Sequence, residues 1–187
     1  MTPLQNVAEF TAILKKQSAE TKTIKADFTE EKHMAVLKEP QKSSGMFYYK
    51  KADMLRWEKV KPNPYIFLSA NNKVKIKDSG NEKDVSSFNQ VIGRIKDLML
   101  TLVNGEFEGN KMFAPTYFEN ATSYIVKLKP KSKKMANMFD YIQLTFSKKS
   151  LLLDEMAFFE KSGDKNKMKF YNQKVNENLD DQLFLNF

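Results

Sequence analysis

Three pairs of adjacent carboxylates and one histidine are the residues of this chain that could carry acid–base or metal chemistry. The pairs are Glu30-Glu31, Asp154-Glu155 and Asp180-Asp181, and the histidine is His33. General acid–base catalysis by two carboxylates requires both side chains to face one substrate, whereas adjacent residues on a strand point to opposite faces. The first two pairs lie in strand-like segments and are therefore poor acid–base pairs. One histidine in a chain without cysteine forms neither a Cys–His pair nor a zinc site with a second histidine.

A phosphate-binding loop is also missing, because Gly105 and Gly109 are not followed by the Lys-Ser/Thr pair that such a loop requires. We therefore expect a protein that is not an enzyme, with no catalytic residues, no metal site and no cofactor. What remains is apolar surface, since the chain has 15 Phe, 10 Met and 7 Tyr. Residues 46–49 and 65–68 are apolar at consecutive positions, although a strand buried on one face needs only alternate ones. Both a thick core and a cavity for an apolar ligand explain this pattern.

Length and composition predict a single globular domain over residues 1–187. The net charge is +8, but the lysines are spread along the chain and only Arg56 and Arg94 are arginines. Nucleic-acid binders usually cluster arginines, so no nucleic-acid partner is expected. An anionic glycan or lipid head group remains a weaker alternative. The sequence contains no run of 18 apolar residues, so no membrane-spanning helix is predicted. We expect a monomer.

Two helices are predicted from apolar residues at helical spacing. The first would start with Thr2 as N-cap, Pro3 at the first helical position and Gln5 completing a capping box, and would run to about Gln17. The second covers residues 88–103 and ends near Asn104-Gly105, a typical C-terminal signal. A single helical turn is expected at residues 135–139, and Leu183 to Leu185 are expected to pack as a short plug.

Between these segments the apolar period is two, which predicts strands. About ten are expected, at residues 24–28, 46–50, 55–58, 65–69, 73–77, 112–113, 123–129, 140–147, 151–160 and 167–171. Residues 51–53 would form a turn, and Asn71-Asn72 a hairpin turn, since Asn tolerates positive φ. Short connections between sequential strands favour an antiparallel meander, and a long sheet must curl. The predicted class is α+β: a strongly curved antiparallel sheet covered on its concave side by helices.

Seven positions between residues 44 and 68 carry a motif: Gly45, Lys51, Ala52, Arg56, Trp57, Pro62 and Ile66. This order and spacing resemble the signature of the periplasmic lipoprotein carrier family (the LolA type). Residues 24–30, 71–74 and 170–184 resemble the first strand, the turn-plus-strand and the closing strand with tail of that family. Two positions depart from it, because Lys51 stands where the family usually has Arg and Ala52 where it has Pro.

The resemblance implies an incomplete β-barrel closed by a helical lid, with a hydrophobic cavity that holds lipoprotein acyl chains. The expected cavity residues come from the strands and from the helix at residues 88–103: Phe28, Phe47, Trp57, Phe67, Val91, Ile92, Ile95, Leu98 and Met99. In the family, the Arg at the position of Lys51 ties the lid to the barrel. Lys51 and Arg56 are therefore the expected lid contacts, with weaker contacts from Lys51 because an ammonium lacks bidentate geometry.

The function implied by the resemblance is a non-enzymatic periplasmic carrier that ferries lipoproteins from the inner to the outer membrane. Its partners would be the acyl chains of lipoproteins, an inner-membrane lipoprotein release complex and an outer-membrane acceptor. The sequence would then be the mature part, with its signal peptide removed. The alternative is a sensing or protein-interaction module on the same fold.

Overall fold

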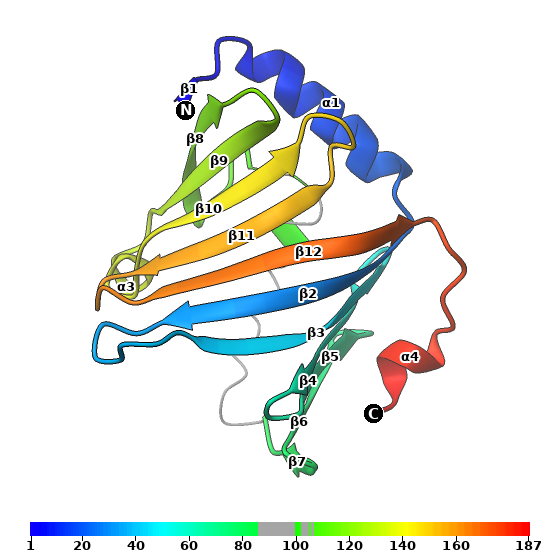
Figure 1. Ribbon diagram of the computed structural model, residues 1–187. Coiled ribbons are helices and arrows are strands. Elements are labelled where there is room, and N and C mark those ends of the chain that lie inside the picture. Colours follow the sequence, from blue (N-terminus) through cyan, green and yellow to red (C-terminus); the bar gives the residue numbers. More distant parts are fainter. Residues whose placement is uncertain (86–99, 102–104, 106) are drawn as a thin grey trace. The chain divides into compact units, whose positions relative to one another are not determined.

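The computed structural model describes residues 1–85, 100–101, 105 and 107–187 (Figure 1). The chain forms two compact units. Unit 1 comprises Met1–Gln17, Glu30–Lys42 and Gly105–Phe170, and unit 2 comprises Ser18–Thr29, Ser43–Asn104 and Tyr171–Phe187. Of the helix predicted at residues 88–103, only Leu100 and Thr101 are described, and both are helical. Whether helices cover a concave face of the sheet therefore remains a prediction.

The described residues contain one 12-stranded, mostly antiparallel sheet with end strands β1 and β7, in the order β1-β8-β9-β10-β11-β12-β2-β3-β4-β5-β6-β7. The strands are β1 Thr2–Pro3, β2 Thr23–His33, β3 Gln41–Lys50, β4 Met54–Lys61, β5 Tyr65–Ala70, β6 Lys73–Asp78, β7 Asn81–Lys83, β8 Phe113–Glu119, β9 Ser123–Pro130, β10 Phe139–Ser147, β11 Leu153–Glu160 and β12 Lys165–Val175. The helices are α1 Val7–Glu20, α3 Lys133–Ala136 and α4 Gln182–Leu185. The predicted antiparallel sheet is confirmed.

The N-terminal helix starts later than predicted. Thr2 and Pro3 form β1, which pairs with β8, and α1 begins at Val7. Asn6 provides the cap instead: its Oδ1 accepts the Glu9 backbone N–H at 3.1 Å, and its Nδ2 donates to the Glu9 carboxylate at 2.7 Å. The predicted cap at Thr2 was wrong because Asn6, with an acidic residue three positions on, satisfies the free N–H groups of the helix start more completely.

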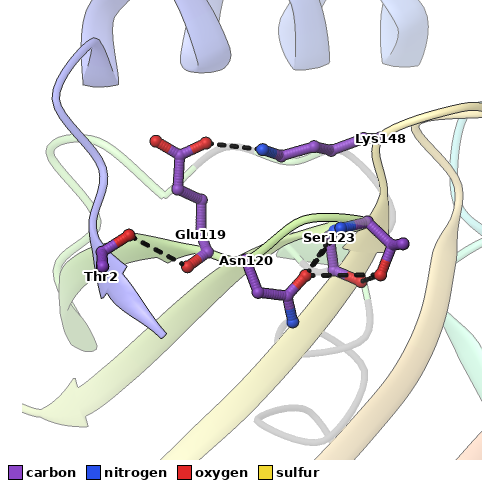
Figure 2. Close-up of polar contacts among 6 residues, drawn as sticks. Thr2, Glu119, Asn120, Ser123 and Lys148 are labelled. Atoms are coloured by element: carbon purple, nitrogen blue, oxygen red, sulfur yellow. Dashed lines mark hydrogen bonds and ion pairs between the residues drawn. The ribbon is translucent and has the colours of Figure 1, made fainter.

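The β8–β9 turn of unit 1 is held by polar contacts (Figure 2). Asn120 Oδ1 accepts the backbone N–H groups of Thr122 and Ser123 at 2.9 and 2.8 Å. The Glu119 carboxylate pairs with Lys148 Nζ at 2.6 Å. β8 is longer than the strand predicted at residues 112–113 and includes Pro115. A proline is tolerated here because β1 pairs only with the last two residues of β8, so that Pro115 has β9 as its one strand neighbour among the described residues.

Unit 2 contains the hairpins of the predicted motif. Asn71 and Asn72 have φ of 51° and 58°, which confirms the predicted turn between β5 and β6. Gly45 lies at an irregularity of the β3–β4 pairing, where a Cβ atom would come within 1.8 Å of the Glu58 carbonyl oxygen. Only glycine permits this approach of two backbones. The predicted plug is α4, whose Phe184 is buried.

Candidate functional site on the sheet of unit 2

Four predicted cavity residues of unit 2 lie on one face of its sheet. Phe47 pairs directly with Trp57, and Trp57 with Phe67, so these side chains from β3, β4 and β5 point the same way. Phe28 of β2 reaches the same cluster, with its ring centroid 4.3 Å from that of Trp57; the Phe47 ring lies 5.7 Å from it. We call this the tryptophan face. Register gathers three of these residues and ring contact adds Phe28, so that aromatic residues up to 39 positions apart in sequence meet on one face.

The tryptophan face is closed in this structure. Phe28 is 0% exposed and Trp57 8%, with Phe47 and Phe67 between them. Ser69, two residues beyond Phe67 and thus on the same face, is also 0% exposed, and its hydroxyl has no hydrogen-bond partner among the described residues. A buried hydroxyl without a partner costs free energy. The cluster therefore combines tight aromatic packing with one hydroxyl group that the described residues leave without a hydrogen bond.

The opposite face of the same strands is built around Arg56, and we call it the arginine face. Arg56 is 7% exposed. Its Nε pairs with Glu58 at 2.7 Å, while its Nη1 donates to the carbonyl oxygens of Leu183 at 3.0 Å and Asn186 at 2.9 Å. The planar guanidinium suits this task because its donors are fixed in a fork. Arg56 thus ties β4 to the end of the chain.

Two lysines extend this attachment of the C-terminal tail (residues 176–187). Lys50 Nζ donates to the Leu179 carbonyl at 2.7 Å and pairs with Asp181 at 2.6 Å. Lys75 Nζ donates to the Leu185 carbonyl at 2.8 Å. The last carbonyls of a helix have no intrahelical donor, so cations at the end of α4 satisfy otherwise free acceptors.

Apolar contacts complete the arginine face. Tyr48 and Ala70 of the sheet form a cluster with Leu179 and Phe184 of the tail. Burial raises the pKa of the Tyr48 hydroxyl, and Glu58 raises it further against the opposing effect of Arg56. The tail therefore accounts for part of the consecutive apolar pattern in β3 and β5. The sequence predicted that Leu183 to Leu185 pack as a plug, but not that this plug covers the face of the sheet around Arg56 or that Arg56, Lys50 and Lys75 hold it.

Five predicted cavity residues lie outside the described residues: Val91, Ile92, Ile95, Leu98 and Met99. The contacts of Lys51 and Arg56 with a lid formed by that segment therefore stay a prediction. Lys51 itself is described. Its Nζ donates to the Ala19 carbonyl in the last turn of α1 at 3.0 Å, and its backbone N–H donates to the backbone carbonyl of Lys22 at 2.8 Å. Lys51 thus fastens the β3–β4 turn to the junction between α1 and β2.

Neither metal binding nor membrane spanning finds support among the described residues. These residues contain no group of three or more His, Cys, Asp or Glu side chains that could hold a metal ion. None of the helices formed by them has the length and apolar character needed to cross a bilayer.

A family model and the curated relatives of this chain name the same kind of protein. The model of a family described as outer membrane lipoprotein carrier protein LolA matches residues 19–186. The outer-membrane lipoprotein carrier proteins of Pseudomonas aeruginosa (strain UCBPP-PA14) and Pseudomonas paraeruginosa (strain PA7) are each 27% identical over 145 residues, covering 77% of this chain and 67% of theirs.

Solved structures also resemble this chain. A LolA superfamily protein from Nitrosomonas europaea has a TM-score of 0.45 at 10% identity, covering 98% of this chain and 97% of its own. The Mycobacterium tuberculosis lipoprotein LppX has a TM-score of 0.49 at 7% identity, covering 93% and 98%.

Proposed function

The chain belongs to the LolA family of outer membrane lipoprotein carrier proteins, and we propose that it is a non-enzymatic periplasmic carrier. In this proposal it takes lipoproteins from an inner-membrane release complex and delivers them to the outer membrane, where an acceptor receives them. The match of residues 19–186 to the carrier family is the observation that carries the proposal. The aromatic cluster of the tryptophan face supports it, because it provides a large apolar surface within one unit.

The physical task of such a carrier is to hide acyl chains from water. Each buried CH₂ group contributes about 0.8 kcal/mol, so a lipid with several chains does not leave a membrane unaided. The carrier must supply comparable burial and still release its cargo. A site that is already filled by its own side chains meets both demands, because uptake exchanges protein contacts for lipid contacts and the net free energy stays small.

We place the acyl chains against the tryptophan face. Phe28, Phe47 and Phe67 lie around Trp57 there. These side chains offer apolar area, and the hydrophobic effect that would bind an acyl chain to them is non-directional, so ligands of variable shape can be accepted. The five predicted residues of the helix at 88–103 complete the proposed lining. The arginine face is unsuitable for acyl chains because its apolar centre is covered by the tail through hydrogen bonds to Arg56 and Lys75.

Trp57 is the chain's only tryptophan, so its fluorescence tests this assignment directly. The probe is a di-acylated lipopeptide whose acyl chains carry bromine, which quenches indole emission on contact. We expect saturable quenching of Trp57 by the brominated lipopeptide, and binding without quenching by the unbrominated one. Ile95→Asp in the predicted lid should weaken binding at least tenfold, equivalent to about 1.4 kcal/mol. Val60→Asp, at an exposed position in β4, is the matched control.

Two outcomes separate the site from the function. Lipopeptide that binds without quenching Trp57 would show a carrier whose site lies elsewhere than the tryptophan face. Absence of binding, together with absence of any lipoprotein that co-purifies from the periplasm, would contradict the carrier proposal itself and favour a protein-interaction role on the same fold.

A further inference from the structure

The most exposed large apolar side chain of the described residues is at the tip of the β2–β3 loop in unit 1. Val36 is 88% exposed, and its neighbour Leu37 is 45% exposed. Single exposed apolar residues are ordinary on protein surfaces. Two consecutive ones at a loop tip are notable when the loop is fixed in a defined shape, and this loop is.

Two hydrogen bonds fix the loop. The Leu37 N–H donates to the Met34 carbonyl at 2.9 Å, which closes a tight turn with Val36 near its apex. The Ala35 N–H donates to Asp164 Oδ1 at 2.9 Å, which ties this turn to the β11–β12 turn. The Val36 side chain is therefore held out into solvent by a built turn.

A third exposed apolar residue lies on the other side of the β11–β12 turn. Met138 is 49% exposed, and its carbonyl accepts the backbone N–H of Lys161 at 3.0 Å. Figure 1 shows the β2–β3 loop, the β11–β12 turn and α3 at the same end of the strands. We call Val36, Leu37 and Met138 together the apolar tip.

Lysines accompany the apolar tip. Lys38 follows Leu37 directly and is exposed, and Lys133 at the start of α3 is exposed too. The carboxylates of this end are largely engaged: Asp140 pairs with Lys161, and Asp164 accepts the Ala35 N–H. Glu39 is the exposed carboxylate beside Lys38. The chain as a whole carries a net charge of +8, which favours an anionic surface as partner.

We propose that the apolar tip docks this protein on the surface of a bilayer that contains anionic lipids. Val36, Leu37 and Met138 enter the head-group boundary, and Lys38 and Lys133 contact lipid phosphates. A protein partner fits less well, because a stable interface buries roughly 800 Å² per partner and three side chains at a tip supply only a fraction of that. Interfacial membrane binding needs only a few apolar side chains together with cations.

This inference rests on the proposed function for its purpose, since a carrier must meet a membrane to collect or deliver lipid. Its test needs no cargo. Because the chain has no cysteine, Val36→Cys creates a single labelling site for an environment-sensitive fluorophore. Val60→Cys in unit 2, also partly exposed, is the matched control. The partners are vesicles of phosphatidylethanolamine with phosphatidylglycerol, and vesicles of phosphatidylcholine alone.

We expect a blue shift of the label at position 36 on anionic vesicles and none at position 60. In the unlabelled protein, the double substitution Val36→Asp and Leu37→Asp should weaken co-flotation with these vesicles by about tenfold or more. Lys38→Gln should weaken it less and reduce its salt dependence. Unchanged thermal unfolding of each variant would exclude misfolding, which is not expected at such exposed positions.

A label at position 36 that stays in water on both vesicle types would overturn the proposal. Equal binding to phosphatidylcholine and anionic vesicles would overturn the assignment of the lysines. Because cargo-free protein is used, failure here leaves the lipopeptide result of the tryptophan face untouched.

Discussion

The two faces of the unit 2 sheet are covered by different kinds of contact. On the tryptophan face, Phe28, Phe47 and Phe67 pack around Trp57 through apolar contacts, without a hydrogen bond or ion pair between these four side chains. On the arginine face, Arg56, Lys50 and Lys75 hold particular carbonyl oxygens of the tail. Both faces are buried, yet only one is tied by bonds that a lipid chain cannot replace.

This difference indicates which of its own contacts a carrier can exchange for contacts with an acyl chain. Apolar contacts depend on buried area and can be reproduced by an acyl chain of similar bulk. A hydrogen bond to a buried charge is lost outright when its partner leaves, with a cost larger than the bond itself. Two phenylalanines, one on each face, allow the comparison to be tested with the same substitution.

Phe28→Ala should have the largest effect of the changes considered. Phe28 is fully buried in a strand inside the sheet, so the loss should be about 3–5 kcal/mol of unfolding free energy. Phe184→Ala removes an equally buried ring, but from the tail. We expect the tail to detach without unfolding the sheet, in which case Phe184→Ala lowers global stability by no more than the free energy that holds the tail.

Urea denaturation measures the global effect, and hydrogen exchange of residues 179–186 measures the local one. We expect Phe184→Ala to speed exchange in the tail while the strands around Trp57 stay protected. Equal losses of global stability in both variants would mean that tail and sheet unfold together, and would contradict the distinction between the faces.

Gly45→Ala should damage both faces at once. The new Cβ would overlap the Glu58 carbonyl, and backbone atoms cannot swing aside as a flexible side chain does. We expect a loss of about 3 kcal/mol or more, measured by thermal or urea unfolding. Gly80→Ala is the control, since it has free space but a φ of +86°. Its cost should be about 1 kcal/mol. Similar costs at the two positions would show that β3 and β4 separate easily.

Strand period and turn chemistry made much of this fold predictable. Alternation located β2 to β6, although β2 continues past the predicted end to His33 and β3 begins before the predicted start, at Gln41. The positive-φ tolerance of Asn identified the turn at Asn71-Asn72. The gathering of Phe28, Phe47, Trp57 and Phe67 followed once the register was right. Their role toward lipid is still a prediction.

The arginine face could not be predicted in the same way. Its contacts join Arg56 to Leu183 and Asn186, more than 120 residues away, and the acceptors are backbone carbonyls that every residue possesses. Side-chain types therefore carry no signal for them. β1 was not predicted for a related reason. Two residues are too few to show a period, and their pairing with β8 is a long-range contact that local sequence does not specify.

Arg56→Met should release the tail without disturbing the tryptophan face. The substitution keeps much of the apolar stem but removes both carbonyl contacts and leaves Glu58 without this partner, at a cost of about 2 kcal/mol. Arg56→Lys should cost less, although one ammonium cannot reach all three acceptors with the same geometry. Faster proteolysis after residue 176 with unchanged Trp57 emission is the expected result. A shift of that emission would show that the faces are coupled through β4.

The smallest effect is expected at two hydroxyl groups, one satisfied and one not. Ser69 on the tryptophan face is buried, and its hydroxyl has no hydrogen-bond partner in the part of the chain that the structure describes, so Ser69→Ala should raise the free energy of unfolding by about 1 kcal/mol. The Thr23 hydroxyl donates to the Glu177 carbonyl, at the start of the tail, at 2.6 Å. Thr23→Val should therefore lower the free energy of unfolding by about 1 kcal/mol. Urea denaturation of both variants checks the opposite signs.

Lipopeptide binding then tells whether the unsatisfied hydroxyl serves the ligand. Acyl chains offer no hydrogen-bond acceptor, so Ser69→Ala should leave the affinity unchanged if only chains reach the tryptophan face. A loss of affinity would place an ester or amide carbonyl of the lipid beside Ser69, which would set how deeply the cargo enters. A loss of stability on Ser69→Ala would instead mean that the hydroxyl has a partner in solution, and the tryptophan face would then be as fully satisfied as the arginine face.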